Sequence, residues 1–537
     1  MRLRRLAAIA AAMSLAPVAL FLAATGCSEN RQADPAAKQQ AATAARPVDT
    51  PFELHNLSLQ RDTWDIILMQ GKRVGYVHTT LSSAVQSGKK VMVIDQLTHL
   101  AVKRFGQSTE QEIRLQSVET PDGGLLEFSC DEMHQGTTPL KTKGWVAGKQ
   151  LNITTISKGN TSTDSISWSP EFKGFLGGEQ SLLDNPMQPG QQRTIHMLMA
   201  ILNQVATIEM VAGDREPVQL LTGTYELLKI EATITLPGGQ SLHQTIWCDR
   251  AGNGLKTLMK EMGLETFRAT KAQALEKTEA ADLGWGIAVK VEGTLSRPHQ
   301  SKQIRYRVHL DGSDPTTVFV SGASQRVESI NAETADLTVY ALRPDSRNAN
   351  PAAADKPTAD DRQPNNYIQS DHAKVVALAR KACGDETDPW KTAVKLERFV
   401  NDYVSKKDFS QAFATAAEVA ENPVGDCSEH AVLLAALARA RGIPARVAMG
   451  LVFVPDAAAS PEKQAGGKFL YHMWTEVYVD GLWIPIDATL AMGGIGAGHL
   501  KLAHSNLKGA SAISSFISVA QVLGRLKIES RQDPGQR

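Results

Sequence analysis

Short runs of alternating apolar and polar residues, separated by Gly- and Pro-containing turn signals, dominate the chain from 52 to 280. VMVIDQLTHLAVKRF is one such run. Alternation with a period of two is typical of strands that bury one face, so the pattern predicts a large antiparallel β domain over 52–280. Similar alternation predicts a small β unit over 285–342, and the stretch 343–366, rich in Pro, Ala, Asn and Asp, predicts a linker.

From residue 367 onward the apolar spacing changes to that of helices, and we expect 367–537 to form one α+β domain. Asp388-Pro389 predicts a helix start, because aspartate caps a helix and proline suits its first position. Apolar residues at three- and four-residue spacing follow, which predicts an amphipathic helix. A second helix is expected over 412–421, and VLGRLKIE near the end predicts a strand that completes the sheet of this domain.

The segment GDCSEHAVLLAALARARGIPAR carries the most regular helix signal. Asp426 and Glu429 have capping-box spacing, so a helix should begin there, and Gly442 should end it. Ala, Val and Leu lie on nearly every face between these residues, which predicts a central, buried helix. Cys427 then lies in the first turn, where the positive end of the helix dipole favours the nucleophilic thiolate. Position alone leaves open a buried cysteine that acts as a small apolar side chain.

The segment FLYHMWTEVYVDGLWIPIDATL predicts two strands joined by a tight turn at Asp480-Gly481. This pairing puts His472 on the same face as Asp487 and diagonally across the ladder from it. A carboxylate there can accept a hydrogen bond from the imidazole, and the other ring nitrogen can then face a thiol. Pro485 cannot donate to the ladder, so it predicts an edge position or a bulge.

These two segments closely resemble the bacterial transglutaminase-like superfamily, and the resemblance covers about 365–500. That family has a papain-like fold with a Cys, His, Asp triad in this chain order. The resemblance implies that Cys427 is the nucleophile, His472 the base and Asp487 the orienting acid. It also implies the fold class, which is α+β, with the N-terminal antiparallel β region followed by a papain-like, transglutaminase-like catalytic domain over 367–537.

The chemistry that the resemblance implies is acyl transfer or hydrolysis at amide bonds of proteins or peptides, through a thioester on Cys427. Water as the acceptor gives a cysteine peptidase, and a lysine amine gives a transglutaminase; the triad does not distinguish them. The Cys427 backbone N–H is expected to donate to the oxyanion, whereas Tyr471 and Trp474 are among several candidates for a second donor. No cofactor is expected.

The N-terminus predicts export, because residues 1–26 begin with three arginines, continue with an apolar run and end in small residues, as a signal peptide does. Cys27 follows directly and resembles the lipidated cysteine of a bacterial lipoprotein. Residues 27–51 are rich in Ala, Gln and Pro and predict a flexible tether. We therefore expect a lipid-anchored protein of the cell envelope.

The composition of the chain excludes other classes of protein. Lys and Arg together number 57, and so do Asp and Glu. The chain therefore lacks the excess of positive charge that is typical of a nucleic-acid-binding protein. Five cysteines in 537 residues are too few for a disulfide scaffold, although Cys130 and Cys248 could form a bond in an exported protein.

Two alternatives to a catalytic triad remain. The segments ILMQGKRVGYVHTTL and WCDRAGNGLKTLMKEMG loosely resemble bacterial envelope proteins whose half-barrel sheet shelters lipid or peptide. The protein could thus be a non-catalytic, peptide- or lipid-binding lipoprotein. A metal site is also conceivable, but its spacing matches no standard zinc pattern. Its ligands would be Cys427, His430, His472 and either His499 or His504.

Overall fold

Most of the chain beyond the N-terminus is described by a computed structural model. The predicted signal peptide (1–26), the tether (27–51) and Cys27 lie outside the described residues. The described ranges are 54–104, 107–134, 140–157, 160–237, 241–279, 281–282, 288–346, 355–406, 414–456, 466–508 and 517–531.

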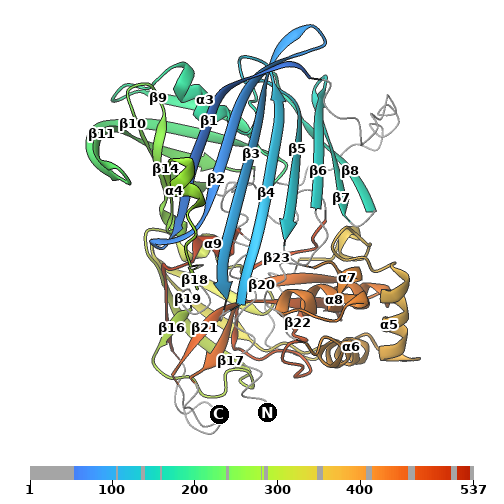
Figure 1. The fold of residues 1–537 in the computed structure, drawn as a ribbon. Coiled ribbons are helices and arrows are strands. Elements are labelled where there is room, and N and C mark those ends of the chain that lie inside the picture. The colour runs from blue at the N-terminus through green and yellow to red at the C-terminus, as the bar shows by residue number, and fades with distance from the viewer. Residues whose placement is uncertain are drawn as a thin grey trace.

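One large sheet contains nearly all the strands of the first half of the chain (Figure 1). The sheet has two arms, β1–β8 and β9–β14, and within each arm strands that follow one another in the sequence pair antiparallel. The pairing of β1 with β14 joins the two arms. The first arm consists of β1 (His55–Met69), β2 (Lys72–Gln86), β3 (Lys89–Arg104), β4 (Gln107–Glu119), β5 (Leu125–His134), β6 (Leu140–Ala147), β7 (Gln150–Ser157) and β8 (Asn160–Ser167). The second arm consists of β9 (Gln192–Met199), β10 (Gln204–Leu220), β11 (Gly223–Thr235), β12 (Ser241–Cys248), β13 (Gly254–Met259) and β14 (Leu264–Ala269), and β15 (Ala281–Asp282) pairs with β3.

The alternation seen in the sequence explains this sheet. In β10, Ile208, Met210 and Ala212 are buried, whereas Glu209 and Val211 between them are exposed. Apolar side chains on the inner face drive burial, and the polar outer face stays in water. Of two short helices, α3 (Gly177–Asp184) contacts β9 of the second arm and α4 (Lys271–Leu275) contacts β1 and β2 of the first.

A second sheet combines strands from both ends of the remaining chain. Its order is β18-β19-β17-β24-β16-β21-β20-β23, with β22 on β21. The predicted small β unit of 285–342 and the predicted domain of 367–537 therefore share one sheet and do not form separate sheets. The strands are β16 (Val289–Glu292), β17 (Gln303–Leu310), β18 (Gln325–Asn331), β19 (Thr334–Tyr340), β20 (Ala445–Pro455), β21 (Gly467–Val479), β22 (Leu482–Ile486), β23 (His499–Ser505) and β24 (Leu526–Ser530).

Four helices pack together beside this second sheet, and α8 lies at their centre (Figure 1). Every residue of α8 from Cys427 to Arg439 is buried, because Ala, Val and Leu cover nearly all of its faces. The helices are α5 (Ala373–Cys383), α6 (Pro389–Tyr403), α7 (Ala416–Glu421) and α8 (Cys427–Ala440), and α9 (Ile517–Gln521) precedes β24. An antiparallel β region followed by an α+β region is the order that the sequence predicted.

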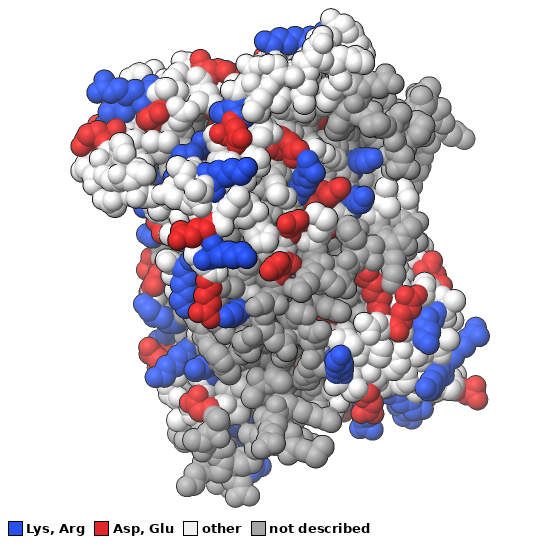
Figure 2. All heavy atoms as spheres, viewed as in Figure 1, with Lys and Arg blue, Asp and Glu red and all other residues white. Residues whose placement is uncertain are grey.

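The described cysteines Cys130, Cys248, Cys383 and Cys427 are all free and buried, so Cys130 and Cys248 are not bonded to each other. Among the helices of the described ranges, none combines the length and the apolar character needed to cross a bilayer. On the face shown in Figure 2, acidic and basic side chains are interspersed over the described surface.

Candidate active site

The N-terminus of α8 fixes the position of Cys427. Asp426 caps the helix by accepting the Ser428 backbone N–H at 3.0 Å, and Glu429 accepts the Asp426 backbone N–H at 2.8 Å. Gly425 before the cap has a φ of 154°, and a Cβ there would come within 2.4 Å of Glu429 Cγ. This capping box is the one the sequence predicted, and it makes Cys427 the first residue of the helix.

Cys427 is 2% exposed, and burial raises the pKa of its thiol well above the ordinary value. The neighbouring carboxyl groups of Asp426 and Glu429 raise this pKa further, whereas a hydrogen bond from the Met473 backbone N–H lowers it. The helix dipole alone therefore does not make Cys427 a resting thiolate, contrary to what its position in the sequence favoured. A proton acceptor beside the sulfur is needed to form the nucleophile.

The β21–β22 hairpin has the register that the sequence predicted. Val479 pairs with Leu482 across the turn, and the ladder reaches Thr475 opposite Ile486. Asp480 and Gly481 have φ values of 50° and 82°, the left-handed conformation that a two-residue hairpin of type I′ requires. Within the described residues β22 pairs with β21 alone, so Pro485 lies on an edge strand. Its missing N–H therefore removes no hydrogen bond between strands.

The hairpin brings His472 and Asp487 into direct contact, with Nε2 of the imidazole 2.8 Å from Oδ2 of the carboxylate. Both side chains are almost completely buried. The other carboxylate oxygen, Oδ1, accepts the Thr489 backbone N–H at 2.8 Å and the Thr489 hydroxyl. Burial alone would raise the pKa of Asp487, but His472 and His499 hold it well below the usual range. The carboxylate is therefore charged and held by hydrogen bonds.

The geometry leaves Nδ1 of His472 as the nitrogen available to Cys427. This atom is buried and has no hydrogen-bond partner among the described residues. The Met473 backbone N–H that reaches the Cys427 sulfur belongs to the residue directly after His472. The structure thus joins His472 to Asp487 and places the Cys427 sulfur beside the backbone of Met473, the residue after His472. The catalytic roles of Cys427, His472 and Asp487 stay a prediction.

Two site residues were not identified from the sequence as partners of Asp487. His499 at the start of β23 places its Nε2 3.2 Å from Asp487 Oδ2, and the sequence had offered it only as a metal ligand. Glu397 in α6 accepts the backbone N–H groups of Asp487 at 3.3 Å, Gly493 at 2.7 Å and Gly494 at 3.2 Å. Glu397 occupies the apolar face of its helix, four residues after Ala393. A carboxyl group within that face was the signal that could have revealed it.

Burial raises the pKa of Glu397 to about 7, although its backbone donors oppose this shift. The side chain is completely buried and takes part in no ion pair that the structure shows. Its role is to accept backbone N–H groups from the segment that follows β22, which carries Asp487 and Thr489. Glu397 is therefore part of the support of the site.

Of the metal ligands that the sequence offered as an alternative, the structure brings His472 and His499 together at Asp487, and His430 is not part of this group. His430 is buried in α8, and its Nδ1 bonds the Asp426 carbonyl. Among the described residues, one group of three can present metal-binding atoms within 4.8 Å of one another, namely His472, Asp487 and His499. Two imidazoles and a carboxylate suit Zn²⁺, but both imidazole nitrogens already lie at hydrogen-bond distance from the carboxylate. Direct hydrogen bonds account for this cluster.

The part of the chain that contains the three predicted catalytic residues matches a known family. Residues 376–488 match the model of the transglutaminase-like superfamily. This part of the chain is a transglutaminase-like domain. The matched range contains α8 and the β21–β22 hairpin, and with them Cys427, His472 and Asp487, which confirms the family resemblance and the fold class expected from the sequence. No curated protein sequence gives a significant match.

Three solved structures are similar to parts of the chain. A candidate cysteine protease from Cytophaga hutchinsonii is 18% identical over 42% of this chain and 83% of its own, with a TM-score of 0.25. A β-barrel-like protein from Brucella abortus is 8% identical over 38% of this chain and 93% of its own, with a TM-score of 0.29. A candidate protease from Parabacteroides distasonis is 10% identical over 65% of this chain and 64% of its own, with a TM-score of 0.17.

Proposed function

We propose that the protein catalyses thiol-dependent acyl transfer or hydrolysis at amide bonds of proteins or peptides. The observation that carries the proposal is the buried hydrogen bond between His472 and Asp487, in a transglutaminase-like domain whose central helix begins with Cys427. A carboxylate that binds Nε2 orients the ring and stabilises its protonated form, so Nδ1 can take the thiol proton.

The reaction follows from these positions. The Cys427 proton passes to His472 Nδ1, and the thiolate attacks the amide carbonyl to form a tetrahedral oxyanion. The imidazolium then protonates the leaving amine or ammonia as the C–N bond breaks, and a thioester remains on Cys427. Water or an acceptor amine, deprotonated by His472, attacks the thioester and regenerates the thiol.

The oxyanion needs hydrogen-bond donors at the start of α8. The backbone N–H of Cys427 at the helix N-terminus is one. The Tyr471 hydroxyl and the Trp474 indole N–H, both considered from the sequence, are buried and have no hydrogen-bond partner among the described residues. Each of them is thus still available as the second donor.

Mass spectrometry of a peptide mixture incubated with the protein tests the proposal. Wild type should produce either cleaved fragments, if water is the acceptor, or new linkages with a loss of about 17 Da, the mass of one ammonia, if an amine is. Cys427→Ala should produce neither. Cys383→Ala is the matched control, because it removes another buried free thiol and should leave the products unchanged. Products that persist in Cys427→Ala would disprove the assignment.

The N-terminal sequence supports a location for this activity. We propose that the protein acts in the cell envelope, anchored through lipid on Cys27 after removal of residues 1–26. The intact mass of the mature protein checks this location: it should begin at Cys27 and carry the added mass of acyl chains. An unmodified N-terminus would contradict the anchor.

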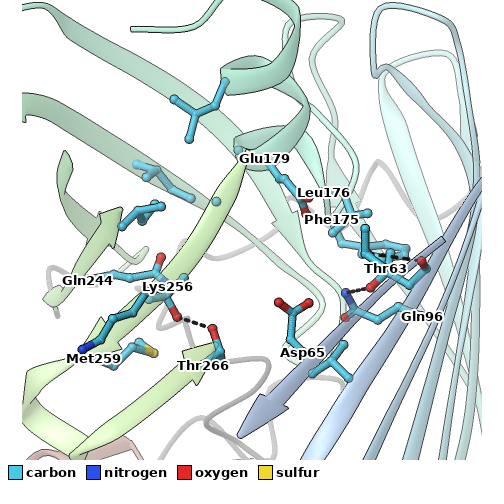
Figure 3. Close-up of a pocket in the computed structure, with 18 of the residues that line it drawn as sticks. Thr63, Asp65, Gln96, Phe175, Leu176, Glu179, Gln244, Lys256, Met259 and Thr266 are labelled. Atoms are coloured by element: carbon cyan, nitrogen blue, oxygen red, sulfur yellow. Dashed lines mark hydrogen bonds between the residues drawn. The ribbon is translucent and has the colours of Figure 1, made fainter. Parts of the chain in front are cut away.

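A cavity in the large sheet supports a second candidate function, the binding of an apolar ligand. The cavity has a volume of about 300 Å³ and lies between the two arms of the sheet, with Thr63 and Gln96 on one arm and Gln244 and Thr266 on the other (Figure 3). This volume is at the lower end of the range for small-molecule pockets. Its apolar lining consists of Val77, Phe175, Leu176, Leu182, Met197, Met199, Ile208, Met210, Ile234, Ile246, Leu255, Met259 and Leu264.

Filling this cavity should weaken the binding of a fluorescent fatty acid. Met210→Trp places an indole among the inner side chains of β10, so we expect the affinity for the probe to fall roughly tenfold or more. Val211→Trp on the exposed side of the same strand is the matched control and should bind as wild type does. Equal binding by wild type and both variants, or no binding by wild type, would exclude this candidate.

A further inference from the structure

A second imidazole contacts the oxygen of Asp487 that His472 uses. His499 Nε2 lies 3.2 Å from Asp487 Oδ2, and His472 Nε2 lies 2.8 Å from the same atom. His499 comes from β23, which pairs with β20 and not with the β21–β22 hairpin. The two imidazoles therefore reach the carboxylate from different strands, and both are buried.

The protons of this cluster can be assigned from its chemistry. A charged carboxylate only accepts hydrogen bonds, so each Nε2 atom that contacts Oδ2 must carry a hydrogen. His472 and His499 both donate to Oδ2, and Thr489 donates to Oδ1 through its backbone N–H and its hydroxyl. These four donors occupy the roughly four acceptor positions of a carboxylate. Asp487 therefore has no free acceptor position with which it could bind another donor.

Neighbouring rings hold His499 in place. Trp474 and His299 both pack edge-on against it, with ring centroids 5.2 Å and 5.6 Å away. His299 is itself fixed, because its Nε2 lies 2.8 Å from the Phe453 carbonyl, to which it must donate. The ring of His499 therefore cannot swing away from Asp487 without displacing packed aromatic side chains.

We propose that His499 is a positioning residue. Its hydrogen bond to Oδ2 fixes the Asp487 carboxylate against His472 and stabilises the negative charge of that carboxylate. This role rests on the proposed acyl-transfer function. His499 acts through Asp487 and does not touch the reacting atoms.

His499 can play this part as a neutral donor, because its surroundings favour the uncharged ring. Burial lowers its pKa, and repulsion from His472 lowers it further, although Asp487 opposes both effects. The titratable groups that face it are Asp487, His472 and His299, and burial also lowers the pKa of His299, to about 4. A neutral donor holds the carboxylate without cancelling the charge that the His472 imidazolium needs.

Removal of this donor has a specific consequence for His472. Without the His499 N–H, Oδ2 keeps His472 as its imidazole donor, and the carboxylate loses one of its four fixed donors. The orientation of the carboxylate is then less restricted, so it holds the His472 ring less firmly with Nδ1 turned towards the thiol.

The test measures the rate at which iodoacetamide alkylates Cys427 in the full chain, from mildly acidic to alkaline pH. His499→Leu removes the N–H and keeps an apolar side chain, and it should lower the rate at neutral pH roughly tenfold. His499→Gln restores an N–H donor and should stay within about threefold of wild type. His504→Leu, five residues along β23, is the matched control.

The outcomes separate the two proposals. A wild-type Cys427 that reacts no faster than Cys383 would contradict the proposed function itself. Fast wild-type labelling with an unchanged rate in His499→Leu, or an equal loss of rate in His499→Gln, would overturn only the positioning role. Thermal melting of each variant identifies a loss of folding. A wild-type rate that changes with added Zn²⁺ or with a chelator, lost in both His499 variants, would show metal ligation and would likewise overturn the role.

Discussion

Replacement of His472 with alanine is expected to reduce the alkylation rate of Cys427 at neutral pH by about a thousandfold. The reason is the environment of the sulfur, which is buried and whose pKa is raised well above the ordinary value. A thiol in such a place forms its thiolate only by transferring the proton to a base that stays beside it. The variant should recover reactivity as the pH rises, because hydroxide then removes the thiol proton without help. The difference from wild type should therefore narrow in alkaline solution.

The control for this experiment is the other histidine near Cys427. His430→Ala removes a buried imidazole of α8 whose Nδ1 bonds the Asp426 carbonyl. We expect its alkylation rate to stay within about threefold of wild type, because the thiol keeps its base. An equal loss in both variants would mean that packing, and not proton transfer, governs the reactivity of the thiol.

Asp487→Asn is expected to lower the rate of amide cleavage or transfer by about 10³- to 10⁴-fold, the effect known for this change in Ser-His-Asp enzymes. Asp487 accepts hydrogen bonds on both oxygens, from two imidazoles at Oδ2 and from Thr489 at Oδ1. An asparagine has one acceptor oxygen and one NH₂ group, so one set of donors would face another donor. His472 can then keep its contact only by exposing the wrong nitrogen, which leaves Nδ1 protonated and unable to take the thiol proton.

The hairpin that carries Asp487 offers a matched control. Asp480→Asn is the same chemical change at an exposed turn position, where asparagine suits a left-handed φ. Its rate of amide turnover should equal that of wild type. Turnover by Asp487→Asn at a comparable rate would show that the carboxylate is not needed for the reaction, and the proposed triad would be wrong.

The features that the sequence predicted well are local ones. The capping box around Cys427 and the two-residue turn at Asp480 involve residues a few positions apart, so spacing alone specifies their geometry. The contact between His472 and Asp487 followed, because the register of a hairpin is fixed by its turn. Pro485 was also consistent with an edge strand, as the structure shows.

The features that the sequence did not predict depend on contacts between distant segments. Glu397 and His499 meet the Asp487 segment only after α6 and β23 have packed around it. The raised pKa of Cys427 could not be foreseen either, because it arises from complete burial and not from position in the helix. Spacing along a chain carries information about neighbours on one element but little about how elements enclose a side chain.

The mixed origin of the second sheet limits how the protein can be divided. Strand β24 lies between β17 and β16, and β16 in turn pairs with β21, the strand that carries His472. A truncated protein that begins at residue 367 would lack both neighbours of β24 and one neighbour of β21, and so would expose unpaired backbone N–H and C=O groups along two strands. Such exposed strand edges promote aggregation. The smallest piece able to fold with an intact triad should therefore begin before Val289 and extend through Ser530.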